Sequence, residues 1–161
     1  ENVGMGITRH VAKHLKVSVK ERYFLENMVK QHLRPGYLSN FERPSEKAIF
    51  RYFRDAKIEA ASLAFLALAD QAATQGKLTT REKTEHHARI CAMILERFFT
   101  VIAQKPKAKR LLTGHDLIKQ LKLQPSPLFA EILTQVEEAQ GLGKITTKAQ
   151  ALALAQKIAK I

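Results

Sequence analysis

Apolar residues recur at three- and four-residue spacing along most of this chain, with polar residues between them. This spacing gathers apolar side chains on one face of a helix, whereas a half-buried strand would alternate apolar and polar residues. Alternating segments are scarce. We therefore predict an all-α fold, in which a helical bundle is followed by a small helical tail.

The first part of the chain contains several signals for helix ends. Ser18 followed by Glu21 is a possible capping box for a helix that runs to about Leu33. The Arg-Pro-Gly segment at 34–36 is expected to end this helix, because proline disfavours helical geometry in the residue before it. A loop should follow, and the next helix is predicted to begin near Ser45.

The segment 58–75 is apolar on nearly every side of a helix, which predicts a position at the centre of a domain. Asp70 is the single ionisable residue between Glu59 and Lys77. We therefore expect its carboxylate to be buried and to have a partner, such as a cation, backbone amides or a metal ion.

A long helix is predicted to begin at Thr79, which offers a second capping box together with Glu82. Its apolar stripe includes the single cysteine, Cys91, whose thiol cannot form an internal disulfide and is expected to be buried. The free thiol suits the cytoplasm. The longest apolar run, 62–69, is much shorter than the ~20 residues that cross a bilayer, so we expect no membrane partner.

Four cations in six residues surround a proline at 105–110, which indicates a domain junction. We therefore predict a helical domain at 1–104 and a basic helical tail at 105–161. Three short helices are predicted in the tail, beginning near Thr113, Ser126 and Thr147.

The charge of the chain favours a polyanionic partner. Lys and Arg number 27 against 15 Asp and Glu, which gives a net charge of +12. So many cations repel one another unless an acidic surface or a nucleic acid covers them. Residues 1–104 hold 17 cations against 11 acids, and residues 105–161 hold 10 against 4, so each part nets +6. The shorter tail is therefore expected to lie nearest a phosphate backbone, the alternative being a solvated basic surface without a partner.

The chain lacks the motifs of a self-contained polymerase. Phosphoryl transfer by two metal ions needs closely spaced carboxylates, but no Asp-x-Asp occurs. The three aspartates, Asp55, Asp70 and Asp116, lie far apart, and neither a glycine-rich phosphate loop nor a Gly-x-Ser-x-Gly motif is present. We expect no catalytic residue in this chain and no cofactor of its own.

Several short segments occur in a definite order along nearly the whole chain. These segments are 1–4, 15–18, 20–21, 28–35, 45–53, 66–72, 111–117, 125–127, 131–133 and 138–141. In this order and spacing they resemble a partial HD domain, its latter half, followed by the RNA-binding tail of bacterial tRNA nucleotidyltransferases and poly(A) polymerases.

The resemblance implies an RNA-binding C-terminal part that positions tRNA or other RNA for nucleotide addition at its 3′ end. The catalytic N-terminal head would be missing from this chain and is expected to use Mg²⁺ with ATP or CTP. Glu1 begins the chain without a methionine, which agrees with a fragment. The resemblance leaves open whether the parent adds CCA, CC, A or poly(A).

By the same resemblance, His32 and Asp70 match metal-site positions of HD domains. The His-Asp doublet that precedes these positions in that family is missing, and His115-Asp116 comes too late in the chain to replace it. An acidic residue at 116 more simply complements the positive start of a helix. We interpret His32 and Asp70 as remnants of a metal site. The alternative function is part of an HD-type metal-dependent phosphohydrolase.

The candidate RNA contacts are cations of the tail. Double-stranded RNA hides its base edges in a deep, narrow groove, so the expected contacts are to phosphate and ribose. The candidates are Lys105, Lys107, Lys109, Arg110, Lys119 and Lys122.

Overall fold

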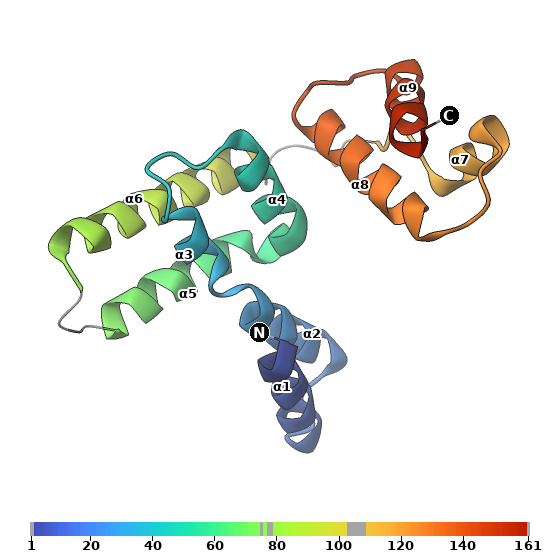
Figure 1. Cartoon of the computed structure of the whole chain (residues 1–161). Helices are drawn as coiled ribbons and strands as arrows, with labels where there is room; N and C mark the ends of the chain where they lie inside the picture. Colours follow the sequence, from blue (N-terminus) through green and yellow to red (C-terminus); the bar gives the residue numbers. More distant parts are fainter. Residues whose placement is uncertain (1, 75, 77–78, 103–108, 161) are drawn as a thin grey trace. The chain divides into compact units, whose positions relative to one another are not determined.

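The computed structural model describes residues 2–74, 76, 79–102 and 109–160, with the side chains of 101 and 102 excepted. Helices make up the regular structure of these residues and no strand occurs among them, so the all-α prediction is confirmed. No helix in these ranges is long and apolar enough to span a membrane. The chain divides into two compact units, residues 1–105 and 106–161, which are described separately (Figure 1).

The first unit begins with a helical hairpin, in which α1 (Asn2–His14) lies beside α2 (Val19–Gln31) (Figure 1). The predicted capping box at the start of α2 is confirmed. The Ser18 hydroxyl accepts a hydrogen bond from the Glu21 amide at 3.2 Å, and the Glu21 carboxylate accepts one from the Ser18 amide at 3.1 Å. Two amides that lack helical partners are thereby satisfied.

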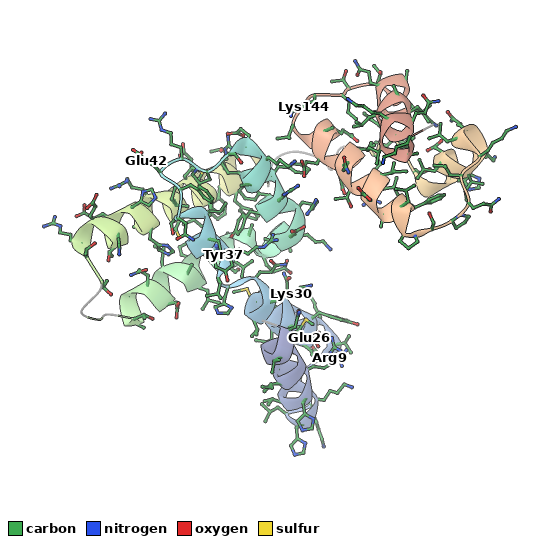
Figure 2. All side chains as sticks on the ribbon, in the orientation of Figure 1. Arg9, Glu26, Lys30, Tyr37, Glu42 and Lys144 are labelled. Atoms are coloured by element: carbon green, nitrogen blue, oxygen red, sulfur yellow. The ribbon has the colours of Figure 1, made fainter. Side chains whose placement is uncertain are left out.

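An ion pair joins the two helices of the hairpin. Arg9 of α1 donates from Nε and Nη2 to the two carboxylate oxygens of Glu26 in α2, at 3.0 and 2.8 Å. Figure 2 shows these two side chains next to each other. Glu26 is buried, and Arg22 lies 3.4 Å from the same carboxylate. The hydrogen bonds from Arg9 hold the pKa of the Glu26 carboxyl below its usual value.

The rest of the first unit is a small helical bundle. Its elements are α3 (Arg34–Leu38), α4 (Glu46–Ala56), the 3₁₀ turn η1 (Lys57–Glu59), α5 (Ala60–Ala73), α6 (Arg81–Arg97) and the π-helical turn η2 (Phe98–Ile102). Helix α5 lies along α6, and α3 and α4 pack against this pair (Figure 1). Ser45 caps α4 as predicted.

The core of this bundle comes mainly from α4, α5 and α6. Tyr52, Leu63 and Ile94 are among its fully buried side chains, and the Tyr52 hydroxyl donates to the Ala60 carbonyl at 2.6 Å. Cys91 is buried here as predicted, and burial raises the pKa of its thiol to about 11. The thiol is therefore held in its protonated, unreactive form near neutral pH.

Two predicted helix boundaries in this unit are wrong. The Arg-Pro-Gly segment at 34–36 does not lead into a loop, since it lies within α3. Pro35 occupies the first turn of α3, where a missing amide hydrogen costs nothing. The cap of α6 is Thr80 and not Thr79, because the Thr80 hydroxyl accepts from the Lys83 amide at 3.3 Å.

Helix α5, predicted at 58–75, lies at the centre of the first unit, where it contacts α2, α3, α4 and α6, but it is not buried on every side. The buried residues of α5 come from its first two turns and are mostly alanines, whereas Phe65 and Leu66 are exposed. Asp70, near the end of α5, is exposed as well. Neighbouring helices cover one side of α5, so the Asp70 carboxylate keeps its water and needs no buried partner.

The second unit contains three short helices, α7 (Gly114–Leu121), α8 (Pro127–Gly141) and α9 (Lys148–Ala159). Their predicted starts are confirmed, with Thr113, Ser126 and Thr147 at the N-cap positions. The helices enclose a separate core. Its buried residues are Leu112, Leu117, Ile132, Val136, Ala151 and Ala155.

Asp116 joins α7 to α9. Its carboxylate accepts hydrogen bonds from the Thr113 amide at 2.9 Å, from the Thr113 hydroxyl at 2.6 Å and from the Lys148 ammonium at 2.5 Å. The prediction that this residue belongs to a helix start is confirmed. The Lys148 and Thr113 donors lower the pKa of the Asp116 carboxyl well below its usual range.

Protonation of Asp116 is expected to destabilise the second unit. The pKa in the folded chain lies below the unfolded value of ~3.9, so the stabilisation is fully present above that value and is lost as pH falls through the folded pKa. Asp116→Asn should lower the free energy of unfolding at neutral pH, and its difference from the original chain should shrink in acid. Urea unfolding of both proteins from about pH 7 to pH 2 measures this difference, and a constant difference would contradict the assignment.

Candidate functional site

The tail places four of the six candidate RNA contacts on its surface. Lys109, Arg110, Lys119 and Lys122 are exposed. Lys105 and Lys107 lie outside the described residues. Exposure is the first requirement for a phosphate contact, because a long cationic side chain must reach an external polyanion.

Gln140 of α8 fixes the segment that carries Lys109 and Arg110. Its side-chain amide donates to the Lys109 carbonyl at 2.8 Å, and its carbonyl oxygen accepts from the Leu111 amide at 3.1 Å. The Arg110 guanidinium lies 3.6 Å from the carboxylate of Glu137, which is one turn before Gln140 in α8. The two cations are therefore held at the second half of α8. No local sequence pattern indicates this role of Gln140, since its hydrogen bonds join residues 29 and 31 positions apart.

Lys119 and Lys122 lie at the end of α7. Lys122 is the C-cap residue and has a left-handed backbone conformation with φ of 52°. This conformation costs an ordinary residue about 1 kcal/mol, whereas glycine adopts it freely. Both ammonium groups lie near the negative end of the helix dipole, which offsets part of that cost.

Most lysines in the described part of the tail, residues 109–160, form no ion pair with another described residue. Lys148 pairs with Asp116, and Arg110 lies near Glu137. Six other lysines form no ion pair with any described residue: Lys109, Lys119, Lys122, Lys144, Lys157 and Lys160. We call these six residues the free tail lysines. Their charge is available to an external anion.

A pocket in the first unit brings together His32 and Asp70, the two candidate metal-site residues. Its volume is about 480 Å³. The remaining lining residues are Leu33, Gly36, Ser39, Asn40, Ala67, Gln71, Lys83, His86 and His87. His32 and Asp70, which are 38 positions apart in the sequence, thus line one pocket. Sequence reasoning missed His86 and His87 as part of the same pocket.

Each of the three histidines of this pocket is hydrogen-bonded to another group of the protein. His32 Nδ1 lies 2.8 Å from the Val29 carbonyl, and His86 Nε2 lies 3.1 Å from a backbone carbonyl. A carbonyl can only accept, so the ring nitrogen that faces it donates the hydrogen bond. His87 is buried and is engaged at both nitrogens, by Ser39 at 3.0 Å and by Ala67 at 3.3 Å.

The pocket does not fit a resident metal ion. No three His, Cys, Asp or Glu side chains of the described ranges are grouped closely enough to hold one. A transition metal needs four to six ligands, and two protein ligands leave most positions to water. The interpretation of His32 and Asp70 as remnants of a metal site stays a prediction.

Metal analysis of the purified chain is expected to find no stoichiometric transition metal, because His32 and Asp70 alone cannot close a site. The chain would be dialysed against zinc or manganese, freed of excess metal and measured by mass spectrometry. One tightly held ion per chain, lost on substitution of both residues by alanine, would overturn the remnant interpretation.

Comparison with known proteins identifies relatives of one kind. Residues 101–155 match a family model described as tRNA nucleotidyltransferase domain 2. A CC-adding tRNA nucleotidyltransferase of Synechocystis sp. is 46% identical over 50 residues, which make up 31% of this chain and 12% of the relative. No solved structure matches the chain.

A second relative aligns with almost the whole chain. The A-adding tRNA nucleotidyltransferase of Deinococcus radiodurans is 28% identical over 162 residues, covering 99% of this chain and 35% of the relative. The chain thus spans about a third of the length of this relative. The family match falls on the tail, and the longer alignment covers the segments whose order carries the resemblance. The chain is thus similar to tRNA nucleotidyltransferases in its tail and, at lower identity, along almost its whole length.

Proposed function

We propose that this chain is the RNA-binding part of a tRNA nucleotidyltransferase. It would hold tRNA, or another RNA, while a catalytic head outside this chain adds nucleotides to the 3′ end. The observation that carries the proposal is the coincidence of two features in one unit. The family match at 101–155 falls on the tail, and six exposed lysines of the tail form no ion pair with any residue that the structure describes.

Unpaired lysines are a suitable surface for a polyphosphate backbone. Each phosphate contact releases condensed counterions, which gives affinity without selecting a base sequence. Gln140 supports this use of the tail, because it holds the Lys109 and Arg110 backbone against α8. A pre-ordered cation loses less conformational entropy on binding than one on a loose segment.

The composition of the tail favours a folded RNA over a single strand. Proteins that bind single strands stack the bases on exposed aromatic side chains. Phe129 is the one Phe, Tyr or Trp in residues 109–160, and it packs against the core of the tail. The tail therefore offers charge without a stacking platform, as expected for contacts to the phosphates and riboses of a tRNA body.

The catalytic head remains part of this proposal. It would supply the Mg²⁺ site and the selection of ATP or CTP, since the present chain has no Asp-x-Asp and its described part holds no cluster of metal ligands. The names of the two relatives specify CC addition and A addition, and this chain does not distinguish between them. A cytoplasmic location also stays a prediction.

A second candidate function is supported by the pocket of the first unit. His32 and Asp70 line one cavity of about 480 Å³, as expected for part of an HD-type phosphohydrolase. The lack of a third grouped ligand among the described residues argues against it. Release of phosphate from nucleotides or p-nitrophenyl phosphate with added manganese, abolished by His32→Ala, would favour this alternative.

Binding of labelled tRNA to the 161-residue chain tests the proposal. Fluorescence anisotropy would be measured over a salt series, with an unstructured single-stranded RNA of equal length as the control ligand. We expect saturable tRNA binding whose affinity falls steeply with salt, and weaker binding of the single strand. Absence of saturable binding at about 50 mM salt would exclude the proposed role.

A further inference from the structure

Helix α7 turns toward solvent a side that carries basic residues and no acidic one. His115, Lys119 and the C-cap residue Lys122 are exposed, and their spacing of four and three residues aligns them along this side. Ile118, which is 43% exposed, lies among them. At 3.6 residues per turn the four positions span an arc of about 100°, turned away from the buried Leu117. We call these four residues the α7 face.

The positive charge of the α7 face is not offset by its surroundings. Asp116 is the acidic residue of α7, but its carboxylate is bound by Thr113 and Lys148 and is only 18% exposed. Within the described part of the chain, no residue forms an ion pair with Lys119 or Lys122. A surface of this kind attracts a polyanion.

Helix α9 ends in the same way as α7, which provides a comparison within the tail. Lys157 lies in its last turn, and Lys160 is an exposed C-cap residue with φ of 58°. The family match at 101–155 includes all of α7 and stops before both of these lysines. Helix α7 also follows closely after Arg110, in the segment that Gln140 holds against α8. These two differences favour α7 as the helix that meets RNA.

We propose that the α7 face is the surface on which the tail binds the phosphate and ribose backbone of RNA. This inference rests on the proposed function and gives the contact a defined place on the tail. Lys119 and Lys122 would each neutralise a phosphate. The His115 ring can donate to a phosphate oxygen or a ribose hydroxyl, and Ile118 can contact the carbon atoms of a ribose.

Lys122→Gly separates a phosphate contact from a purely structural role of this residue. The backbone of Lys122 is left-handed, with φ of 52°, and glycine adopts that conformation freely. The urea midpoint of the chain should therefore not fall, whereas the salt dependence of tRNA binding should become shallower by ~1. A lysine that serves only the negative end of the helix dipole would leave tRNA affinity and its salt dependence unchanged.

A pair of double variants tests the whole inference. Lys119→Gln with Lys122→Gln should weaken binding of labelled tRNA to the 161-residue chain at least about threefold at 0.1 M salt, with a slope shallower by ~1.5–2. Lys157→Gln with Lys160→Gln removes the same two charges from the same positions of α9 and should leave affinity and slope nearly unchanged. Fluorescence anisotropy over a salt series measures both, and circular dichroism verifies the fold.

Two results would overturn the inference and leave the proposed function intact. Equal losses in the α7 and α9 variants would show that RNA responds to the total charge of the tail and not to the α7 face. An unchanged slope in the folded α7 variant would place the RNA elsewhere. Absence of saturable tRNA binding by the original chain would instead contradict the proposed function, and the inference would fall with it.

Discussion

Replacing Lys105, Lys107, Lys109 and Arg110 with glutamine is expected to weaken tRNA binding by at least about tenfold at 0.1 M salt. If these residues neutralise phosphates, their loss removes up to four counterion-releasing contacts and makes the logarithmic salt dependence shallower by as much as ~3–4. Different tRNAs should lose affinity alike, since phosphate contacts carry no base information. Anisotropy titrations over a salt series measure both the affinity and the slope.

A second variant controls for the change in net charge. Lys13, Lys16, Lys20 and Lys30 are exposed lysines of the first unit, and their replacement by glutamine removes the same four charges. This control is expected to bind tRNA with nearly the original slope. Circular dichroism would verify that both variants remain helical. An unchanged slope in the folded junction variant, or equal losses in both variants, would mean that the junction does not contact the RNA.

The chain alone is expected to add no nucleotide to RNA. Nucleotide addition requires paired carboxylates that hold two metal ions, and the three aspartates are far apart in sequence. Two of the aspartates are already engaged, Asp55 by Arg34 at 2.6 Å and Asp116 by Lys148 at 2.5 Å. The measurement is extension of a tRNA that lacks its terminal residues, with labelled ATP and CTP and magnesium.

The A-adding relative from Deinococcus radiodurans serves as the positive control for this assay, with a tRNA that lacks its terminal A. The expected result is extension by the relative and none by the present chain above a protein-free control. Template-independent extension by the 161-residue chain would show that a complete catalytic site lies within it, and the proposed missing head would then be wrong.

The helix starts could be predicted because capping is local. Ser18, Ser45, Thr113 and Thr147 each accept a hydrogen bond from an amide three residues later, which depends on residue types at a fixed short spacing. The predicted N-cap of α6 is wrong by one residue, because two threonines are adjacent and the hydroxyl of Thr80, not that of Thr79, caps the helix.

Long-range contacts explain the other failures. Asp70 was expected to be buried because α5 is apolar all round, but burial depends on which faces the neighbouring helices cover. The Arg9–Glu26 ion pair joins residues 17 positions apart, and the Gln140–Lys109 hydrogen bond joins residues 31 positions apart. No short sequence pattern predicts either contact. Pro35 lies in the first turn of α3, which begins at Arg34 after α2 has ended at Gln31.

The candidate sites were predicted to different degrees. The family resemblance singled out His32 and Asp70, and the structure places both in one pocket, although it groups no third ligand with them among the described residues. Charge density singled out the tail, whose free lysines are exposed. Charge alone does not identify which of these lysines contact a phosphate, because a lysine that binds RNA and a lysine that only contacts water cannot be distinguished by residue type.

Amide chemical shifts of the isotope-labelled chain, followed during addition of tRNA, test the central claim most directly. The account predicts that the largest changes cluster in the tail, around Lys109, Arg110, Lys119 and Lys122, and that they diminish as salt is raised. Changes confined to residues 2–100, with the amides of 109–160 unaffected at saturating tRNA, would contradict it.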